Sequence, residues 1–243
     1  MTLDKLQKEA HVWFVIPENI KESKIISEFF SLLSTEEINR HNRFYFSEDR
    51  HRYLVSHAFV RSVLSKYLEK HPGDLKFHYT ENGKPEILAN QNNQIVRFNL
   101  SHTKGLTVCI VTRNDDCGID TEKIDNKTAS IDVARLMFSE SEFKFLKYLS
   151  GRTYLEEFFT RWTLREAYVK ALGHGIDYPT NKLLFNIVDD KNIRVSIDDV
   201  NDAVSQYWQF QTMRPTSNHI VSIALKNENK IQKSIICSWL QKK

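Results

Sequence analysis

One order of expected elements occurs twice along this chain, and the repeat restricts the fold more than any other feature of the sequence. In each half, strand patterns surround a capping box and a long segment whose apolar residues recur at helical spacing. The capping boxes are Ser34 with Glu37 and Ser139 with Glu142, and the helical segments are residues 46–70 and 155–173. The first long helix should end near Pro72, and Gly173 is placed as the C-cap of the second.

Short apolar or alternating segments between these helices predict strands. They cover residues 11–17, 75–87 with a turn, 95–102, 105–112, 117–122, 182–188, 193–197, 208–213 and 219–225. The expected fold class is therefore α+β, with two similar α/β halves, each an antiparallel sheet packed on a long helix. The expected halves are residues 1–104 and 105–243, with the active site in the groove between them.

Composition excludes several classes of protein. Hydrophobic residues make up 41% of the 243 and charged residues 27%, as in ordinary soluble globular proteins. No stretch approaches the roughly 20 consecutive apolar residues of a membrane span, and the charged N-terminus does not resemble a signal peptide. The net charge of +3 is too small to predict nucleic-acid binding, but it suits a polyanionic small molecule or an acidic protein partner. The three cysteines show no metal-ligand or disulfide spacing, so we expect a reducing cytoplasm.

Asp120 and Glu122 form the first of three segments that carry chemistry. Side chains two apart on a strand point to the same face, so these carboxylates should converge. Close carboxylates repel unless a cation lies between them, and magnesium typically takes one or two carboxylates together with substrate phosphates and water. Taken alone, such a pair is more often a solvated strand face.

One face of the second long helix forms the second segment. Trp162, Glu166 and Lys170 follow one another at i, i+4 spacing and should stack. Burial of Trp162 would fix the rotation of the helix, Glu166 would then complete a metal site, and Lys170 would reach a phosphate. Taken alone, a surface Glu–Lys pair is the simpler interpretation.

The third segment is an expected strand that ends in Ser101 and His102. A serine hydroxyl and histidine ring nitrogens are natural donors to phosphate. A Ser-His pair for acyl transfer is disfavoured, because adjacent strand residues point to opposite faces and no G-x-S-x-G elbow is present. Upstream, the segment Asn-Gly-Lys-Pro indicates a tight turn that carries Lys84.

Three motifs together resemble the signature of the surfactin-type 4'-phosphopantetheinyl transferases. They are FNLSH at 98–102, GIDTE at 118–122 and WTLREAYVKALGHG at 162–175, in this order and spacing. The turn NGKP and the arm RHNRFYFSEDRHRYL at 40–54 are similar to further elements of that family. The resemblance runs from about residue 32 to residue 175, and it implies a pseudo-dimer of two α/β units in one chain, hence a monomer.

The resemblance implies transfer of the phosphopantetheine arm of coenzyme A to a serine of an acyl or peptidyl carrier protein, with release of 3',5'-ADP. The implied magnesium ligands are Asp120, Glu122 and Glu166, and manganese would also accept such ligands. The implied coenzyme A contacts are Lys170 and His102 at the phosphates, Ser101 along the molecule, Lys84 by the nucleotide, and Arg40 and Arg52 at the 3'-phosphate. Fatty acid, polyketide and peptide synthesis all use such carriers, and the sequence does not select one.

The sequence departs from the family pattern at several positions. Arg165 stands where the motif usually has lysine, and an arginine is a planar fork whereas a lysine is a point charge. Arg40 likewise replaces a lysine, and Glu37 falls where some members place another phosphate-binding lysine. One contact to the 3'-phosphate is therefore expected to be missing. Thr103 replaces a common serine, which is a mild change.

The implied chemistry rests on positioning and on neutralisation of charge. The carrier serine attacks the β-phosphate of coenzyme A, while magnesium, Lys170 and His102 neutralise the charge that develops. Glu166 is the candidate base, either directly or through a metal-bound water, and the sequence leaves both routes open.

The resemblance also implies an apolar patch on which the carrier protein docks. The patch candidates are Leu136, Met137, Phe138 and Phe143, for which core packing is an equal alternative.

Two other functions compete with transfer. A magnesium-dependent hydrolase of nucleotide diphosphates would use the carboxylates but not the Ser101-His102 strand. A module that binds the carrier or coenzyme A without transfer would have no need for three convergent carboxylates.

Overall fold

The computed structural model of the chain describes residues 3–88, 96–175, 178–197, 205–227 and 232–240. The chain divides into two compact units. Unit 1 comprises residues 1–80, 85–114 and 233–243, and unit 2 comprises residues 81–84 and 115–232. The compact units thus change over at residue 114, while the expected division of the halves at residue 104 stays a prediction.

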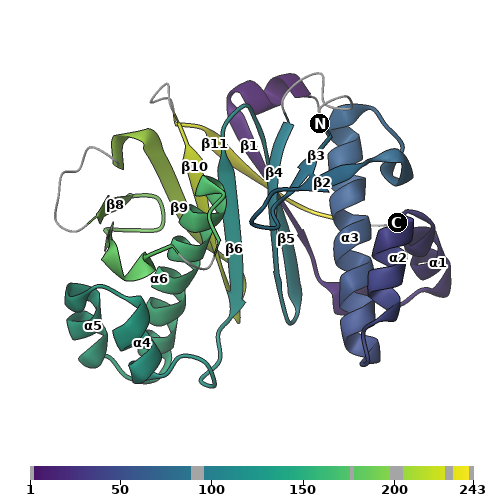
Figure 1. Ribbon diagram of the computed structural model, residues 1–243. Helices are drawn as coiled ribbons and strands as arrows, with labels where there is room; N and C mark the ends of the chain where they lie inside the picture. Colours follow the sequence, from purple (N-terminus) through teal and green to yellow (C-terminus); the bar gives the residue numbers. More distant parts are fainter. Residues whose placement is uncertain (1–2, 89–95, 176–177, 198–204, 228–231, 241–243) are drawn as a thin grey trace. The chain divides into compact units, whose positions relative to one another are not determined.

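Unit 1 is built on a four-stranded sheet with the strand order β11-β1-β5-β4 (Figure 1). The strands are β1 (Glu9–Val15), β4 (Val96–Thr103), β5 (Leu106–Arg113) and β11 (Ser234–Trp239). Neighbours pair antiparallel, as expected, except at the β11 edge, where β11 runs parallel to β1. β5 lies in the middle of this sheet, hydrogen-bonded to β4 on one side and to β1 on the other.

Among the helices described in unit 1, one starts at a side-chain cap and two do not. They are α1 (Ser23–Ser31), α2 (Thr35–Asn42) and α3 (Ser47–Leu68), with short 3-10 turns η1 (Leu3–Gln7), η2 (Pro17–Asn19) and η3 (Pro72–Asp74) and a hairpin of β2 (Phe77–Tyr79) and β3 (Pro85–Ile87). The predicted capping box starts α2, because Ser34 and Glu37 accept each other's backbone N–H groups. α3 ends where Glu69 adopts a left-handed conformation, shortly before Pro72.

The core of unit 1 lies between α3 and the sheet. Buried apolar residues of α3 pack in one cluster with side chains of β1, β4 and β5. The cluster includes Val55, Ala58 and Phe59 from the helix and Trp13, Val15, Phe98 and Val111 from the strands. The apolar periodicity of residues 46–70 therefore predicted the buried face of this helix.

Unit 2 is built on a three-stranded antiparallel sheet with the order β6-β10-β9 (Figure 1). Its strands are β6 (Cys117–Lys123), β9 (Trp208–Thr216) and β10 (His219–Lys226), and a separate hairpin is formed by β7 (Leu183–Ile187) and β8 (Ile193–Ile197). The expected antiparallel strands of the second half are thus confirmed, and they belong to two sheets.

The helices of unit 2 are α4 (Ile131–Met137), α5 (Glu140–Lys147) and α6 (Gly151–Leu172), with 3-10 turns η5 (Thr180–Lys182) and η6 (Ser205–Tyr207). The second predicted capping box, Ser139 with Glu142, starts α5, and Gly173 ends α6 in a left-handed conformation with φ +73°. α6 begins at Gly151, earlier than the expected residue 155, and Arg152 in its first turn pairs with Glu156 one turn on. α6 packs on β6 and β10, so the sheet-on-helix arrangement predicted for the second half is present.

No helix in the described ranges combines the length and the apolar character that crossing a lipid bilayer requires.

Candidate active site

Gly118 allows β6 and α6 to approach each other closely. A β-carbon at this position would lie 1.9 Å from the carbonyl oxygen of Ala167 and 2.6 Å from the amide nitrogen of Ala171. Both distances are too short for a real contact, so any side chain at position 118 would push the helix away from the strand. The absence of that side chain brings the polar residues of β6 within reach of those on α6.

Asp120 of β6 and Lys170 of α6 form an ion pair with an Nζ–Oδ1 distance of 2.6 Å. The Asp120 side chain is buried, whereas that of Lys170 is 29% exposed. Glu166 and Trp162 lie one and two helical turns before Lys170, and both are half-buried. Trp162 stacks on Phe158, which lies one turn earlier on the same helix, at a ring distance of 5.9 Å, and it is only partly buried where full burial was predicted.

The carboxylates of this site interact electrostatically. Burial raises the pKa of Glu166, and the negative charge of Asp120 raises it further, while Lys170 lowers it. Glu122 lies two residues after Asp120 on the same face of β6 and is half-buried. The site therefore holds two carboxylates close enough to affect each other, with a third farther along the strand.

These donors fit a magnesium ion only in part. Within the described residues, no three acidic, histidine or cysteine side chains are arranged to hold a metal ion. Magnesium needs only one or two carboxylates when substrate phosphates and waters provide its other ligands. Asp120 and Glu166 satisfy that smaller requirement with oxygen atoms alone.

A turn from residues 81–84 binds the C-terminal end of α6 in unit 2. The Lys84 ammonium donates to the carbonyl of Lys170 at 3.0 Å, and the Asn82 amide donates to the carbonyl of Gly173 at 2.8 Å. Among the predicted site residues, unit 2 thus brings Lys84 together with Lys170. The contribution of Asn82 was not predicted.

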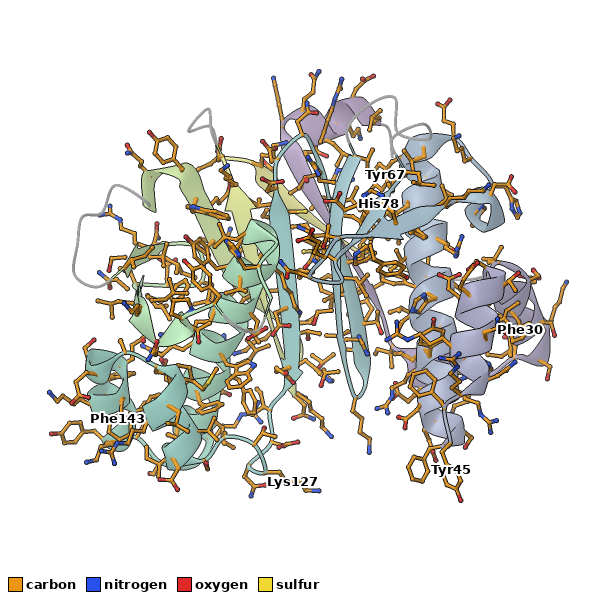
Figure 2. All side chains as sticks on the ribbon, in the orientation of Figure 1. Phe30, Tyr45, Tyr67, His78, Lys127 and Phe143 are labelled. Atoms are coloured by element: carbon orange, nitrogen blue, oxygen red, sulfur yellow. The ribbon has the colours of Figure 1, made fainter. Side chains whose placement is uncertain are left out.

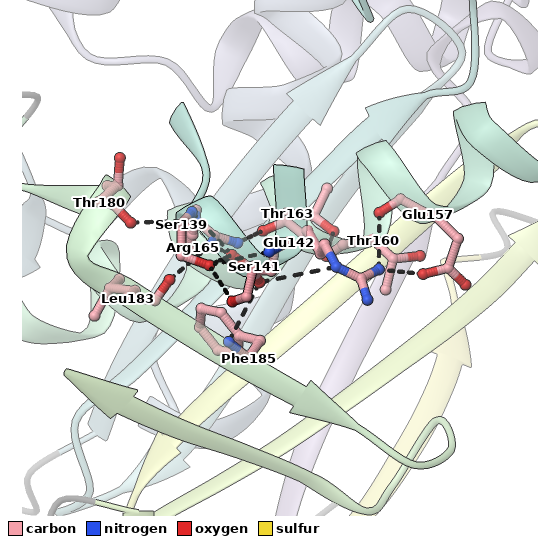
Figure 3. A network of polar contacts seen from close by, with 11 residues as sticks. Ser139, Ser141, Glu142, Glu157, Thr160, Thr163, Arg165, Thr180, Leu183 and Phe185 are labelled. Carbon is pink, nitrogen blue, oxygen red and sulfur yellow. Dashed lines mark hydrogen bonds and ion pairs between the residues drawn. The ribbon is translucent and has the colours of Figure 1, made fainter. Parts of the chain in front are cut away.

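Arg165, whose contact the sequence left open, is buried on the side of α6 that packs against α5 and β7 (Figure 3). Its guanidinium forms an ion pair with Glu142 and donates to the carbonyl of Leu183 at 2.7 Å. It also donates to the carbonyls of Arg161 and Thr180 and lies over the rings of Phe138 and Phe185. All three nitrogen atoms of the planar guanidinium donate hydrogen bonds, and the single side-chain nitrogen of a lysine could not make this set of bonds. Arg165 thus fixes α6 to its neighbours.

Ser101 and His102 lie near the end of β4 in unit 1. Ser101 is opposite Val108 of β5 and is buried, whereas His102 is opposite Thr107 and is exposed. As expected for adjacent strand residues, the two side chains point to opposite faces of the sheet. Of the two, His102 is the one that solvent reaches.

Arg40 and Arg52 line two different hollows of unit 1. Arg40 lies on α2 beside a hollow of about 740 Å³, whose other lining residues are Glu36, Asn39, Arg43 and Phe44. Arg52 lies on α3 beside a hollow of about 810 Å³ and forms an ion pair with Asp49. Lys21, His51 and Lys104 line the second hollow as well. The two arginines that the resemblance assigned to one phosphate group thus line separate depressions.

The predicted docking residues have different surroundings. Leu136 is 73% exposed, and Met137 and Phe143 are partly buried at the edge of a core cluster (Figure 2). Phe138 is 3% exposed and its ring lies beneath the Arg165 guanidinium at 4.7 Å. For Phe138 the alternative of core packing therefore holds, since its ring also packs edge-on against Phe158 of α6.

Sequence reasoning missed Gly118 and Asn82. The signal for Gly118 was present, since a glycine inside a strand often marks the close approach of another backbone. Asn82 gave no local signal, because its partner Gly173 is far away in the sequence.

Comparison with known proteins identifies the family. A sequence model described as the 4'-phosphopantetheinyl transferase superfamily matches residues 116–224, and one described as the N-terminal part of a 4'-phosphopantetheinyl transferase matches residues 21–114. The crystal structure of Thermotoga maritima holo-[acyl-carrier-protein] synthase covers 47% of this chain and 64% of that chain, with 18% identity and a TM-score of 0.38, too weak a likeness to support an argument.

Three relatives span most of the chain. The 4'-phosphopantetheinyl transferase HetI of Nostoc sp. is 36% identical over 72% of this chain and 73% of its own length. The 4'-phosphopantetheinyl transferase Sfp of Bacillus subtilis is 29% identical, with 70% and 74% covered. The L-aminoadipate-semialdehyde dehydrogenase-phosphopantetheinyl transferase of Xenopus laevis is 24% identical, with 81% and 69% covered. This chain therefore belongs to the 4'-phosphopantetheinyl transferase family and is an enzyme of that class.

Proposed function

We propose that this enzyme transfers the 4'-phosphopantetheine group of coenzyme A to a serine of an acyl or peptidyl carrier protein, and that it requires magnesium and releases 3',5'-ADP. The observation that carries the proposal is the cluster of Asp120, Glu166 and Lys170, which β6 and α6 hold together in a partly buried site. Close carboxylates beside an ammonium suit a reaction in which a diphosphate must be bound and its charge neutralised.

Asp120 and Glu166 would hold the magnesium ion, with Glu122 as a third ligand. When bound, such an ion would neutralise negative charge on the diphosphate. Lys170 contributes a second positive charge, and its position beside Asp120 supports this role. Manganese is an alternative with the same oxygen donors.

Coenzyme A would be held by basic and polar side chains. We assign His102 and Lys170 to contacts with its phosphates, and Ser101 to a contact along the molecule. Arg40 and Arg52 are assigned to its 3'-phosphate. The resemblance implies a place for Lys84 near the nucleotide, and in unit 2 its ammonium donates to the carbonyl of Lys170. The exposure of His102 on β4 supports its assignment. The hollow beside Arg52 is lined by basic residues and also by Glu18, Glu48 and Asp49.

In the transfer step, the carrier serine oxygen forms a bond to the phosphorus that carries the pantetheine arm. The bond from that phosphorus to the bridging oxygen breaks, and 3',5'-ADP leaves with the electron pair. Glu166 is the candidate that takes the serine proton. The carboxylates and Lys170 act by orienting the reacting groups and balancing charge, with no covalent intermediate on the enzyme.

We further propose that the carrier protein docks on α4 and α5 and that the two units are related halves of a monomeric pseudo-dimer. The exposed Leu136, with Phe145 and Tyr148 on the same pair of helices, supports docking there. Each unit has a capping box, a 22-residue helix and a sheet on which that helix packs, which supports a common origin of the halves.

The direct test is intact-mass spectrometry of apo carrier proteins incubated with the enzyme and coenzyme A, with magnesium or with a chelator. We expect the mass of one phosphopantetheine unit to be added only when the metal is present. Glu166→Gln should lower the rate by about 100-fold or more, because it removes both a ligand and the candidate base. Near-normal transfer by Glu166→Gln would contradict both assignments, and turnover of coenzyme A without any acceptor would favour a hydrolase.

A further inference from the structure

The last carbonyl groups of α6 are bound by a turn that is distant in the sequence. Asn82 donates to the carbonyl of Gly173 at 2.8 Å, and Lys84 donates to that of Lys170 at 3.0 Å. Carbonyl groups at the end of a helix lack intrahelical donors and carry partial negative charge. An amide N–H and an ammonium group are therefore well matched partners for this end of α6.

Hydrogen bonds consequently hold both the backbone carbonyl and the side-chain ammonium of Lys170. Its carbonyl accepts from Lys84 and from the amide of Gly173, while its side-chain ammonium donates to Asp120 at 2.6 Å. Gly173 itself has a φ of +73°, which ends the helix at this point. The direction in which the Lys170 side chain leaves the helix thus depends on the shape of this last turn.

We propose that Asn82 and Lys84 are positioning residues for the transfer reaction, which fix the last turn of α6 and thereby keep the Lys170 ammonium beside Asp120. The proposal rests on the proposed function, in which Lys170 contacts the diphosphate. Lys84 then acts through the backbone of Lys170, and Asn82, to which the resemblance gave no role, contributes to the same positioning.

Steady-state kinetics with coenzyme A separate this role from a direct contact with the nucleotide. If Lys84 positions Lys170, Lys84→Met lowers kcat by about threefold to tenfold, the worth of one hydrogen bond, and leaves KM for coenzyme A within about twofold. A direct nucleotide contact predicts the reverse, a raised KM with kcat unchanged, and that result would overturn the proposal.

Asn82 provides an independent arm of the test. Asn82→Ala should lower kcat in the same way, and Asn82→Asp should lower it further, because a carboxylate at the C-terminal end of a helix is repelled. Equal and normal kcat values for both variants would refute the role of Asn82.

A double-mutant cycle asks whether the effect passes through Lys170. In a background of Lys170→Met, Lys84→Met should have little additional effect on kcat, since the group that it positions is absent. Full additivity of the two changes would show that Lys84 acts elsewhere.

Hydrogen exchange gives a readout that does not depend on activity. The amides of Gly173 and His174 donate to the carbonyls of Lys170 and Val169, and they should exchange about tenfold faster in Lys84→Met and Asn82→Ala. Lys66→Met, the same substitution at an exposed lysine of α3 in unit 1, is the matched control and should leave these amides unchanged.

The two kinds of failure are distinguishable. If the wild-type enzyme modifies no carrier protein, the proposed function fails, whereas the exchange rates still report on the hydrogen bonds that Asn82 and Lys84 make to the last turn of α6. Unchanged exchange in both variants shows that the hydrogen bonds from Asn82 and Lys84 do not stabilise the last turn of α6. Faster exchange with unchanged kcat shows that these bonds have no positioning role in the reaction. Either result overturns the inference.

Discussion

The two units contain the same buried arrangement of charged residues, and they differ in what surrounds it. In unit 1, Arg61 of α3 pairs with Glu37, the capping-box residue of α2, and donates to the carbonyls of Pro72 and Leu75. In unit 2, Arg165 of α6 pairs with Glu142, the capping-box residue of α5, and donates to the carbonyls of Thr180 and Leu183. Each guanidinium also lies over a phenylalanine ring, Phe77 in one unit and Phe185 in the other.

The two long helices differ in the surroundings of the lysine that follows this arginine. Lys66 and Lys170 both follow their arginine by five positions. Lys66 lies over the ring of Trp13, beside a network in which Tyr67 bonds His11 and Trp13. Lys170 instead pairs with Asp120, next to Glu166. The same helix framework thus carries an aromatic, hydrogen-bonded core in unit 1 and a carboxylate site in unit 2, so the framework supports the chemistry without determining it.

Removal of the buried arginine should have the largest effect. Arg165→Met leaves Glu142 buried without its main partner and should lower the free energy of unfolding by about 3–5 kcal/mol. Urea denaturation followed by circular dichroism measures this. Arg165→Met combined with Glu142→Leu should regain much of the loss, because it also removes the buried charge, and a double variant as unstable as the single one would contradict this explanation.

Acid should weaken the cluster of unit 1. Burial by itself would raise the pKa of Glu37, but hydrogen bonds from His57, the Ser34 amide and Arg61 outweigh it and hold the pKa at about 2, against an ordinary value of 4.5. A lowered folded-state pKa gives stability that is present above pH 4.5 and is lost as the pH falls toward 2. The contribution is about 3 kcal/mol at neutral pH.

This pH dependence is measured by urea denaturation between pH 6 and pH 2, in steps of about one pH unit. In Glu37→Gln the fall in stability over this window should be smaller than in the wild type by about the same 3 kcal/mol. An identical pH profile for the two proteins would rule out Glu37 as the source.

Equivalent lysines should differ in their effect on catalysis. Lys170→Met should lower kcat/KM for transfer by roughly 100-fold, because it removes a positive charge beside the reacting phosphates. Lys66→Met, at the corresponding position of α3, should leave kcat/KM unchanged. Steady-state assays of carrier modification compare the two, and similar losses in both variants would refute the functional difference between the helices.

The aromatic network of unit 1 should matter for stability alone. Tyr67→Phe removes the hydroxyl that bonds His11 at 2.7 Å and accepts from Trp13 at 2.9 Å, and it should cost about 1–3 kcal/mol because the buried Trp13 N–H and the His11 ring nitrogen lose their partner. Thermal unfolding checks the loss, and kcat of the folded variant should be normal. A lowered kcat would mean that this network also takes part in the reaction.

Local signals predicted the two long helices and most strands, but not every element. Both capping boxes and the Gly173 cap are formed as the sequence indicated, since caps involve residues within one turn of each other. The short helices α1 and α4 and the edge strand β11 were not predicted, and β11 pairs with β1, which is distant in the sequence. The i, i+4 face of α6 was predicted because helix geometry fixes it.

Residue types, spacing and local geometry determined by themselves the two long helices, their caps, and the placement of Asp120 and Glu122 on one strand and of Glu166 and Lys170 on one helix face. Only the tertiary structure decided that Gly118 lets α6 approach β6, that Arg165 is buried against Glu142, and that Asn82 and Lys84 bind the end of α6. The physical reason is that helix and strand periodicity act over a few residues, whereas these contacts join segments that are distant in the sequence and meet only when the core is packed.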